Sequence, residues 1–189
     1  MARKNKRLSK EEKMEVEEWI YQNNTEETRM TDTMTITVKC KTENQKTLVN
    51  AIKGKEIIIC SGPAGSGKTF LACAEALRLI KRNSKFKKII IVKSVTTLKN
   101  EEIGFLKGNL REKMEPFMFS FVHNFEKIVG QSITSRLREL KTIEEMPIAY
   151  MRGINLDRSI IIIDEAQNIS QDNIRTIMTR LGKDSKMIF

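Results

Sequence analysis

The feature that most constrains the fold is the run EIIICS (56–61), which is followed at once by GPAGSGKT (62–69). The first run is apolar and rich in isoleucine, which predicts a buried strand covered on both faces. The second run fits the pattern GxxxxGK[ST]. Apolar residues then recur at helical spacing: Phe70, Leu71, Ala74 and Leu77. Because a strand, a glycine-rich loop and a helix follow in this order, the sequence predicts a phosphate-binding P-loop.

The residue types in this loop suit the binding of a nucleotide. Glycines let the backbone turn so that successive N–H groups form an anion nest, and the helix N-terminus adds its positive dipole end. Lys68 is placed to neutralise the β- and γ-phosphates, and the Thr69 hydroxyl is placed to ligate Mg²⁺. A glycine-rich turn that precedes a helix by coincidence would not require this lysine and threonine. The candidate nucleotide-binding residues are Gly62, Pro63, Ala64, Gly65, Ser66, Gly67, Lys68 and Thr69.

An acidic pair, Asp164 and Glu165, follows four consecutive isoleucines. Ligands of open α/β sheets collect at the carboxyl ends of the strands, so we expect this pair beside the P-loop. Asp164 is then the candidate Mg²⁺ residue, while Glu165 and Lys68 are the candidate catalytic residues, Glu165 as the general base. Without the P-loop, ordinary surface acids would be the commoner interpretation. The amide of Gln167 would couple the γ-phosphate to a nucleic-acid path or cap the next loop.

Gln45 is a further candidate nucleotide-binding residue, 17 positions before Gly62 (62 minus 45). It begins a predicted helix that contains Leu48, Val49 and Ile52. A side-chain amide can pair with both the donor and the acceptor on the adenine edge, which would favour ATP over GTP. A solvated helix residue is the alternative interpretation.

Strand and helix patterns alternate from residue 44 onward, which predicts a mostly parallel sheet covered by helices. We expect an α/β fold of the P-loop NTPase type, with three αβα layers. A last strand ending on Met187, Ile188 and Phe189 would leave apolar surface and unpaired edge groups, which truncation or oligomerisation would explain. Buried strands are predicted at 87–94 and 159–164, a final strand at 185–189, and helices around Pro116, over 132–141 and after a cap at Ser170.

Residues 1–41 are predicted to form an N-terminal extension, and residues 42–189 the nucleotide-binding domain. The extension begins with a basic arm over residues 1–8. A capping-box pattern of Ser9 and Glu12 then predicts a short amphipathic helix. The alternating, β-branched run MTITVKC (34–40) predicts a strand.

The composition of the chain bears on its partners and on the compartment in which it works. The formal net charge of +10 suits a polyanionic partner, because clustered cations release counterions from phosphates, although a lysine-rich surface also serves solubility alone. Three cysteines without framework spacing favour a reducing compartment. The chain holds no apolar run of 18 or more residues. We predict a cytoplasmic protein with no membrane partner.

The motifs, taken in order, resemble the PhoH family of P-loop ATPases, including its compact bacteriophage forms. The resemblance covers residues 42–189 and implies ATP and Mg²⁺ as ligands, a core like that of RecA and superfamily 1 helicases, and a link to RNA or single-stranded DNA. It places Gln45 in the adenine-reading position, and Arg152 and Arg180 in family motifs. The segments that carry it are TENQKTLVNAI, GPAGSGKTFLA, EEIGFLKGNLREKMEPF, PIAYMRGINL, IIIDEAQNIS and MTRLGKDSKM.

Two departures from the family pattern qualify this expectation. Lys93 and Ser94 stand where the family usually shows Arg-Pro. The family also continues beyond the last strand with a sensor and with arginines that reach a neighbour's γ-phosphate, so we expect a core that is incomplete at its C-terminus relative to the family.

The leading hypothesis is an ATPase coupled to RNA or single-stranded DNA, working in a homo-oligomeric ring. A nucleotide-dependent switch with little turnover and a small-molecule kinase are the alternatives. A kinase would need an arginine-rich lid, and DEAQ at a strand end fits activation of water better. Basic residues before the second core strand are candidate phosphate contacts or a solvated face: Lys81, Arg82, Lys85, Lys87 and Lys88.

Overall fold

Five parallel strands form one sheet in the order β1-β5-β4-β2-β3. The computed structural model describes residue 25, residues 30–93 and residues 110–189. The strands are β1 (Ile57–Ile58), β2 (Lys88–Lys93), β3 (Ile143–Glu145), β4 (Ser159–Asp164) and β5 (Lys186–Ile188). The helices are α2 (Glu43–Gly54), α3 (Lys68–Arg82), α4 (Leu110–Val129), α5 (Gln131–Glu139) and α6 (Gln171–Met178), with short 3-10 helices η2 (Ile148–Met151) and η3 (Ala166–Asn168).

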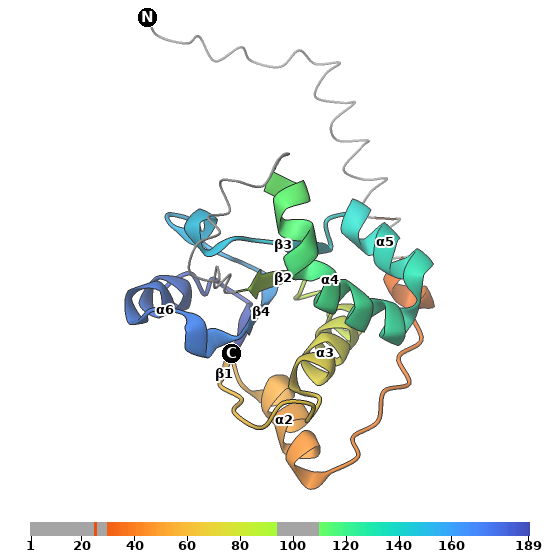
Figure 1. The fold of residues 1–189 in the computed structure, drawn as a ribbon. Helices are drawn as coiled ribbons and strands as arrows, with labels where there is room; N and C mark the ends of the chain where they lie inside the picture. The colour runs from red at the N-terminus through yellow and green to blue at the C-terminus, as the bar shows by residue number, and fades with distance from the viewer. Residues whose placement is uncertain (1–24, 26–29, 94–109) are drawn as a thin grey trace, which may run out of the picture.

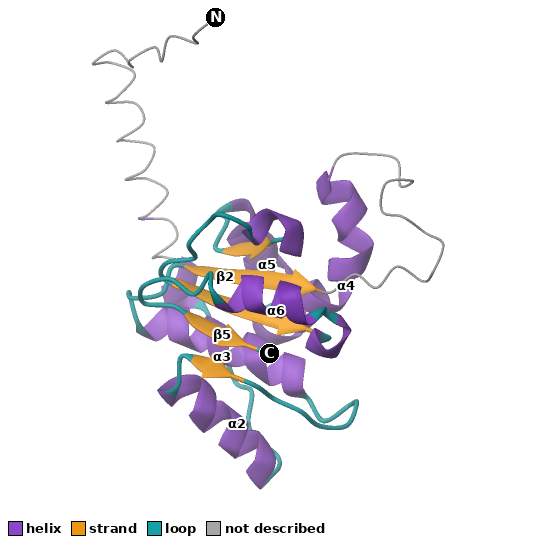
Figure 2. Ribbon diagram, turned by 90° about the vertical axis from the view of Figure 1, so that its left-hand side faces the viewer, coloured by secondary structure: helices purple, strands orange, loops and turns teal. Residues whose placement is uncertain are grey.

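Helices cover both faces of this sheet, which confirms the three-layer α/β prediction. Helices α3, α4 and α5 lie on one face and α6 lies on the other (Figure 1). The strands point the same way across the sheet, so their carboxyl ends share one edge (Figure 2). Along β4, Ile160 and Ile162 join the core under α3, while Ile161 and Ile163 join the core under α6. Because both faces are buried, β4 is apolar throughout, as a central parallel strand must be.

The expectation of an uncovered edge at residues 187–189 is wrong. Strand β5 lies inside the sheet, where Ile188 is paired with Ile58 of β1 and with Ile162 of β4. Met187 is 0% exposed and Ile188 is 3% exposed. The described sheet has its edges at β1 and β3 instead.

The strand prediction for residues 34–40 is also wrong. The segment is extended but pairs with no strand, and it runs along the outside of α3 toward α2 (Figure 1). Its side chains do alternate, with Met34 buried and the next residue exposed. Cations on α3 hold its backbone carbonyl groups instead of a neighbouring strand. Arg78 donates to the carbonyl oxygens of Ile36 and Val38, and Lys81 to those of Asp32 and Met34.

Other sequence predictions divide into three groups. The strand at 159–164, the helix around Pro116 and the helix cap at Ser170 are confirmed, and the Ser170 hydroxyl accepts a hydrogen bond from the amide of Asn173. Strand β3 was not predicted. The basic arm, the helix begun by Ser9 and the position of Ser94 lie outside the described residues.

Candidate nucleotide-binding site

The P-loop joins β1 to α3 through backbone that only glycine adopts easily. Gly65 and Gly67 have φ angles of 76° and 84°, in the left-handed region. An L-residue pays about 1–2 kcal/mol there. Gly67 is also the residue that caps α3, and a Cβ added to it would lie 3.5 Å from Nε2 of Gln45. The contact at 3.5 Å is an ordinary one, so the loop needs glycine for its conformation and not for space.

The first turn of α3 faces this loop. The opening N–H groups of any helix have no acceptor within the helix, so they are available to an anion. Nζ of Lys68 donates to the carbonyl oxygens of Gly62 at 2.8 Å and Pro63 at 2.9 Å. The Ser66 hydroxyl donates to the Pro63 carbonyl at 2.8 Å. The lysine ammonium thus lies against the start of the loop.

Thr69 and Asp164 meet at the carboxyl edge of the sheet. The Thr69 hydroxyl donates to Oδ1 of Asp164 at 3.2 Å. Strands β1 and β4 are not neighbours, because β5 lies between them. The first turn of α3, which contains Thr69, therefore makes the contact with Asp164. A hydroxyl and a carboxylate are the hard oxygen ligands that Mg²⁺ prefers in nucleotide sites. The two residues therefore fit a Mg²⁺ site between the P-loop and the acidic strand end.

Glu165 directly follows β4 in a strained conformation. Its φ and ψ are 53° and 39°, the left-handed region, which is costly for a residue with a Cβ and is often found at functional sites. Its carboxylate accepts a hydrogen bond from Nε2 of Gln167, and its carbonyl oxygen accepts from the amide of Asn168 at 2.9 Å. The Gln167 amide therefore holds the carboxylate proposed as general base, a role that neither sequence interpretation of Gln167 included.

Gln45 lies against the P-loop and is half-buried, so a fully solvated residue does not describe it. Its Nε2 donates to the Ser66 carbonyl at 3.0 Å, and its Oε1 accepts from the Lys41 amide at 2.6 Å. Because a side-chain amide has two N–H groups and two lone pairs, one donor and one acceptor remain for an adenine edge. The side chain ties the loop to the start of α2, whose cap is Thr42.

Several of the remaining candidates are held by protein groups. Arg180 donates to the Ile154 carbonyl at 3.3 Å and to the Thr179 hydroxyl at 3.1 Å, while Arg152 is exposed. Among the basic residues before β2, Lys81 binds backbone carbonyl groups. Ion pairs link Lys85 with Asp184 at 2.9 Å and Lys88 with Glu144 at 3.1 Å.

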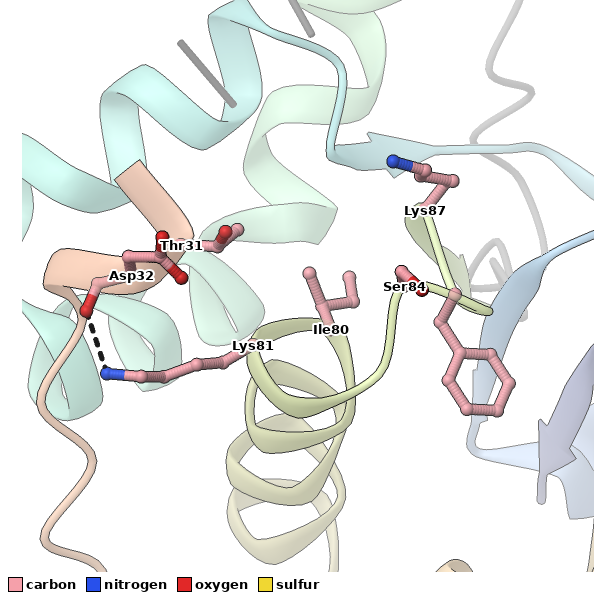
Figure 3. Close-up of a pocket in the computed structure, with 7 residues that line it drawn as sticks. Thr31, Asp32, Ile80, Lys81, Ser84 and Lys87 are labelled. Atoms are coloured by element: carbon pink, nitrogen blue, oxygen red, sulfur yellow. Dashed lines mark hydrogen bonds between the residues drawn. The ribbon is translucent and has the colours of Figure 1, made fainter. Parts of the chain in front are cut away.

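A hollow of about 110 Å³ lies at the other end of α3 (Figure 3). Its lining includes Ile80, Lys81 and the turn residue Ser84, and Lys81 reaches from it to the carbonyl of Asp32. A helix rises about 1.5 Å per residue, so this end of α3 is about 20 Å from the P-loop. The hollow is therefore no part of the phosphate site.

Comparison with known proteins agrees with this geometry. A family model described as PhoH-like protein matches residues 37–189. The chain belongs to the PhoH family. It is 40% identical over 151 residues to a PhoH-like protein of Bacillus subtilis (strain 168), and the match covers 80% of this chain and 47% of the relative. It is 31% identical over 153 residues to protein PhoH of Escherichia coli (strain K12), with 80% and 43% covered.

Membership of the PhoH family identifies the chain as a P-loop NTPase by descent, in agreement with the strand, loop and helix described above. The chain spans less than half the length of these two relatives. In the described part of the chain, no helix has both the length and the apolar character needed to cross a membrane.

Proposed function

We propose that this PhoH-family chain binds ATP with Mg²⁺ at the P-loop and hydrolyses its β–γ phosphoanhydride, in a cycle linked to RNA or single-stranded DNA. The observation that carries the proposal is the 3.2 Å contact between Thr69 and Asp164, which joins the phosphate loop to the acidic strand end. A glycine-rich turn with no ligand would not need a carboxylate from β4 at this place.

Binding rests on the loop and on the first turn of α3. Backbone N–H groups of the loop donate hydrogen bonds to the phosphate oxygens. The Lys68 ammonium leaves the carbonyl oxygens of Gly62 and Pro63 and binds the β- and γ-phosphates. Thr69 and Asp164 would hold Mg²⁺, which would neutralise charge on the phosphate oxygens when bound. Gln45 reads the adenine edge with its remaining donor and acceptor.

Hydrolysis requires a base near the γ-phosphate. Glu165 accepts a proton from water, the water oxygen bonds to the γ-phosphorus, and the bond from that phosphorus to the bridging oxygen breaks. The electron pair of that bond leaves with ADP. Gln167 binds one oxygen of the Glu165 carboxylate, Oε2, and the second oxygen can accept the proton from water.

Two features support a nucleic-acid link. The net charge of +10 suits a polyanion, and the resemblance to PhoH proteins points in the same direction. A homo-oligomeric ring would let a neighbouring subunit supply an arginine, which can be worth about 10³ or more in rate.

Isothermal titration with ATP and Mg²⁺ tests the phosphate site. We expect Lys68→Ala to weaken binding strongly, and Lys183→Ala, an exposed lysine near the amino edge of the sheet, to bind as wild type does. Unchanged affinity in the Lys68→Ala protein would contradict the site.

Measurement of the phosphate released from ATP tests whether Glu165 is the general base. Glu165→Gln should bind ATP normally and lose turnover, while Glu139→Gln, whose residue on α5 pairs with Arg136, should keep it. Unchanged turnover in the Glu165→Gln protein would remove Glu165 from the role.

A nucleotide-dependent switch with little turnover is the second candidate. The hydrogen bond between Gln167 and Glu165 favours it, because the amide occupies one oxygen of the carboxylate and restrains its orientation toward water. Tight ATP binding without phosphate release, with and without single-stranded RNA, would select the switch over the ATPase.

A further inference from the structure

The outer face of α4 carries an aromatic pair that the fold does not use. The inner face of the helix is buried in the core, where Phe121, Phe125 and Ile128 are 0%, 1% and 7% exposed. Phe119, by contrast, is 72% exposed, and His123 is exposed beside it. Phe119 and His123 are four residues apart, a little more than one helical turn, so they share a face of α4. Phe121 and Phe125 each follow them by two residues, which places the core on the opposite side of the helix.

The two rings lie parallel to each other in a stacked arrangement. The Phe119 and His123 ring centroids are 5.9 Å apart and the ring planes differ by 8°. Phe121 and Phe125 satisfy the packing of α4, so Phe119 is not needed for the core. A single exposed ring is common on protein surfaces, so a binding role for Phe119 depends on the residues beside it.

The spacing continues to a cation. Lys127 follows His123 by four residues and is exposed on the same face. Phe119, His123 and Lys127, which we name the α4 stripe, span about 12 Å at 1.5 Å per residue. A base stacks on an aromatic ring, and a lysine contacts the phosphate backbone, so the stripe offers the two contacts that a short single strand requires.

We propose that the α4 stripe binds single-stranded nucleic acid, with a base stacked on Phe119 and a backbone phosphate against Lys127. A duplex is a poorer fit, because its base faces are stacked inside the helix. A membrane surface is also a poorer fit, because interfacial helices bury a wide apolar face and this stripe has one apolar ring. The net charge of +10 favours a polyanion.

This inference rests on the nucleic-acid part of the proposed function and not on ATP turnover. Helix α4 also packs on α3, the helix that begins at the P-loop, because Phe121 and Phe125 share one core cluster with Leu71 and Leu77. The stripe is therefore one helix away from the phosphate site.

Fluorescence anisotropy of a labelled oligouridine at low salt tests the stripe. We expect Phe119→Ala to weaken binding about five- to hundred-fold, the range for loss of one stacked base. Lys127→Ala should reduce the slope of log affinity against log salt by about 0.7. Tyr150→Ala is the matched control, because Tyr150 is 58% exposed and belongs to η2. Its affinity should equal that of wild type.

A second variant reports the stack directly. In a Trp19→Phe background, Phe119→Trp supplies the only indole, whose emission oligouridine should quench while affinity is retained. Equal affinity of wild type and Phe119→Ala for oligouridine would overturn the stripe. So would a change in solution mass on Phe119→Ala without a change in affinity, because the surface would then serve self-association.

The two proposals can fail separately. If wild type binds no single strand, both the stripe and the nucleic-acid link are wrong, while the ATP titration with Lys68→Ala still judges the nucleotide site. If wild type binds oligouridine and Phe119→Ala binds equally, only the stripe is wrong.

Discussion

Thr69 donates a hydrogen bond of 3.2 Å to Oδ1 of Asp164, across 95 positions of sequence. Valine at position 69 keeps the shape of threonine and removes the hydroxyl. We expect Thr69→Val to weaken ATP binding by about 1–2 kcal/mol with Mg²⁺ and much less with EDTA, because the lost group acts through the metal. Titration calorimetry measures both. Thr176→Val is the control, since the Thr176 hydroxyl donates to the Asp172 carbonyl on α6. An equal loss with and without metal would contradict the assignment.

Gly67 has a φ of 84°, in the left-handed region that L-residues rarely adopt. Gly67→Ala should lower the free energy of unfolding by about 1–2 kcal/mol and also weaken ATP binding. The control is Gly54→Ala at the end of α2, where an added Cβ meets nothing within 4 Å. This change should be neutral or slightly stabilising. Urea unfolding compares the two variants, and equal stabilities would show that the loop conformation carries no strain.

Glu75 is 1% exposed on α3 and forms an ion pair with Arg78, which also holds the extended segment 34–40. Arg78→Leu leaves a buried carboxylate without its partner, so we expect a loss of about 3–5 kcal/mol in unfolding free energy. The double variant with Glu75→Leu should recover part of it. Arg175→Leu, from an exposed pair on α6, should change stability by less than about 1 kcal/mol. A double variant less stable than Arg78→Leu would show that the pair is not the cause.

Burial raises the pKa of the Cys73 thiol well above its usual range, and the nearby Asp164 carboxylate raises it further. A raised pKa lowers the thiolate fraction at any given pH, and the thiolate is the reactive form. In native protein at mildly alkaline pH, Cys73 should therefore react with iodoacetamide far more slowly than the partly exposed Cys40 and Cys60. Peptide mapping by mass spectrometry follows each thiol. In urea the three rates should become similar, and fast native alkylation of Cys73 would show that its site opens readily.

Local patterns in the sequence predicted most of the elements that carry the site, but the strand before the P-loop is not the doubly covered strand expected over 56–61. It is the short edge strand β1, in and beside which Ile57 and Ile59 are 39% and 77% exposed. Four isoleucines before Asp164 identify β4, and the serine at 170 identifies the start of α6. Both signals are local, so the tertiary fold does not alter them. Strand β3 escaped prediction because it is short, contains Glu144 and Glu145, and is extended through its pairing with β2.

The sequence patterns do not predict which distant segments contact one another. The alternation over residues 34–40 correctly indicates which side chains are buried, yet it cannot tell whether a strand or the cations of α3 will satisfy the backbone. The order of the strands is also set by contacts between distant segments, because no local pattern places β5 between β1 and β4. Phe119 has one usable signal, its position off the apolar face set by Phe121 and Phe125.

The interior position of β5 has a consequence for synthesis. The strand that leads into the P-loop and the strand that ends at Asp164 are both bonded to β5 and not to each other. A nascent polypeptide therefore cannot complete the sheet until residue 188 has left the ribosome exit tunnel. We expect ATP to protect stalled nascent chains from proteolysis only when the stall lies far enough downstream to release that strand, and earlier protection would show that the two halves of the site assemble without it.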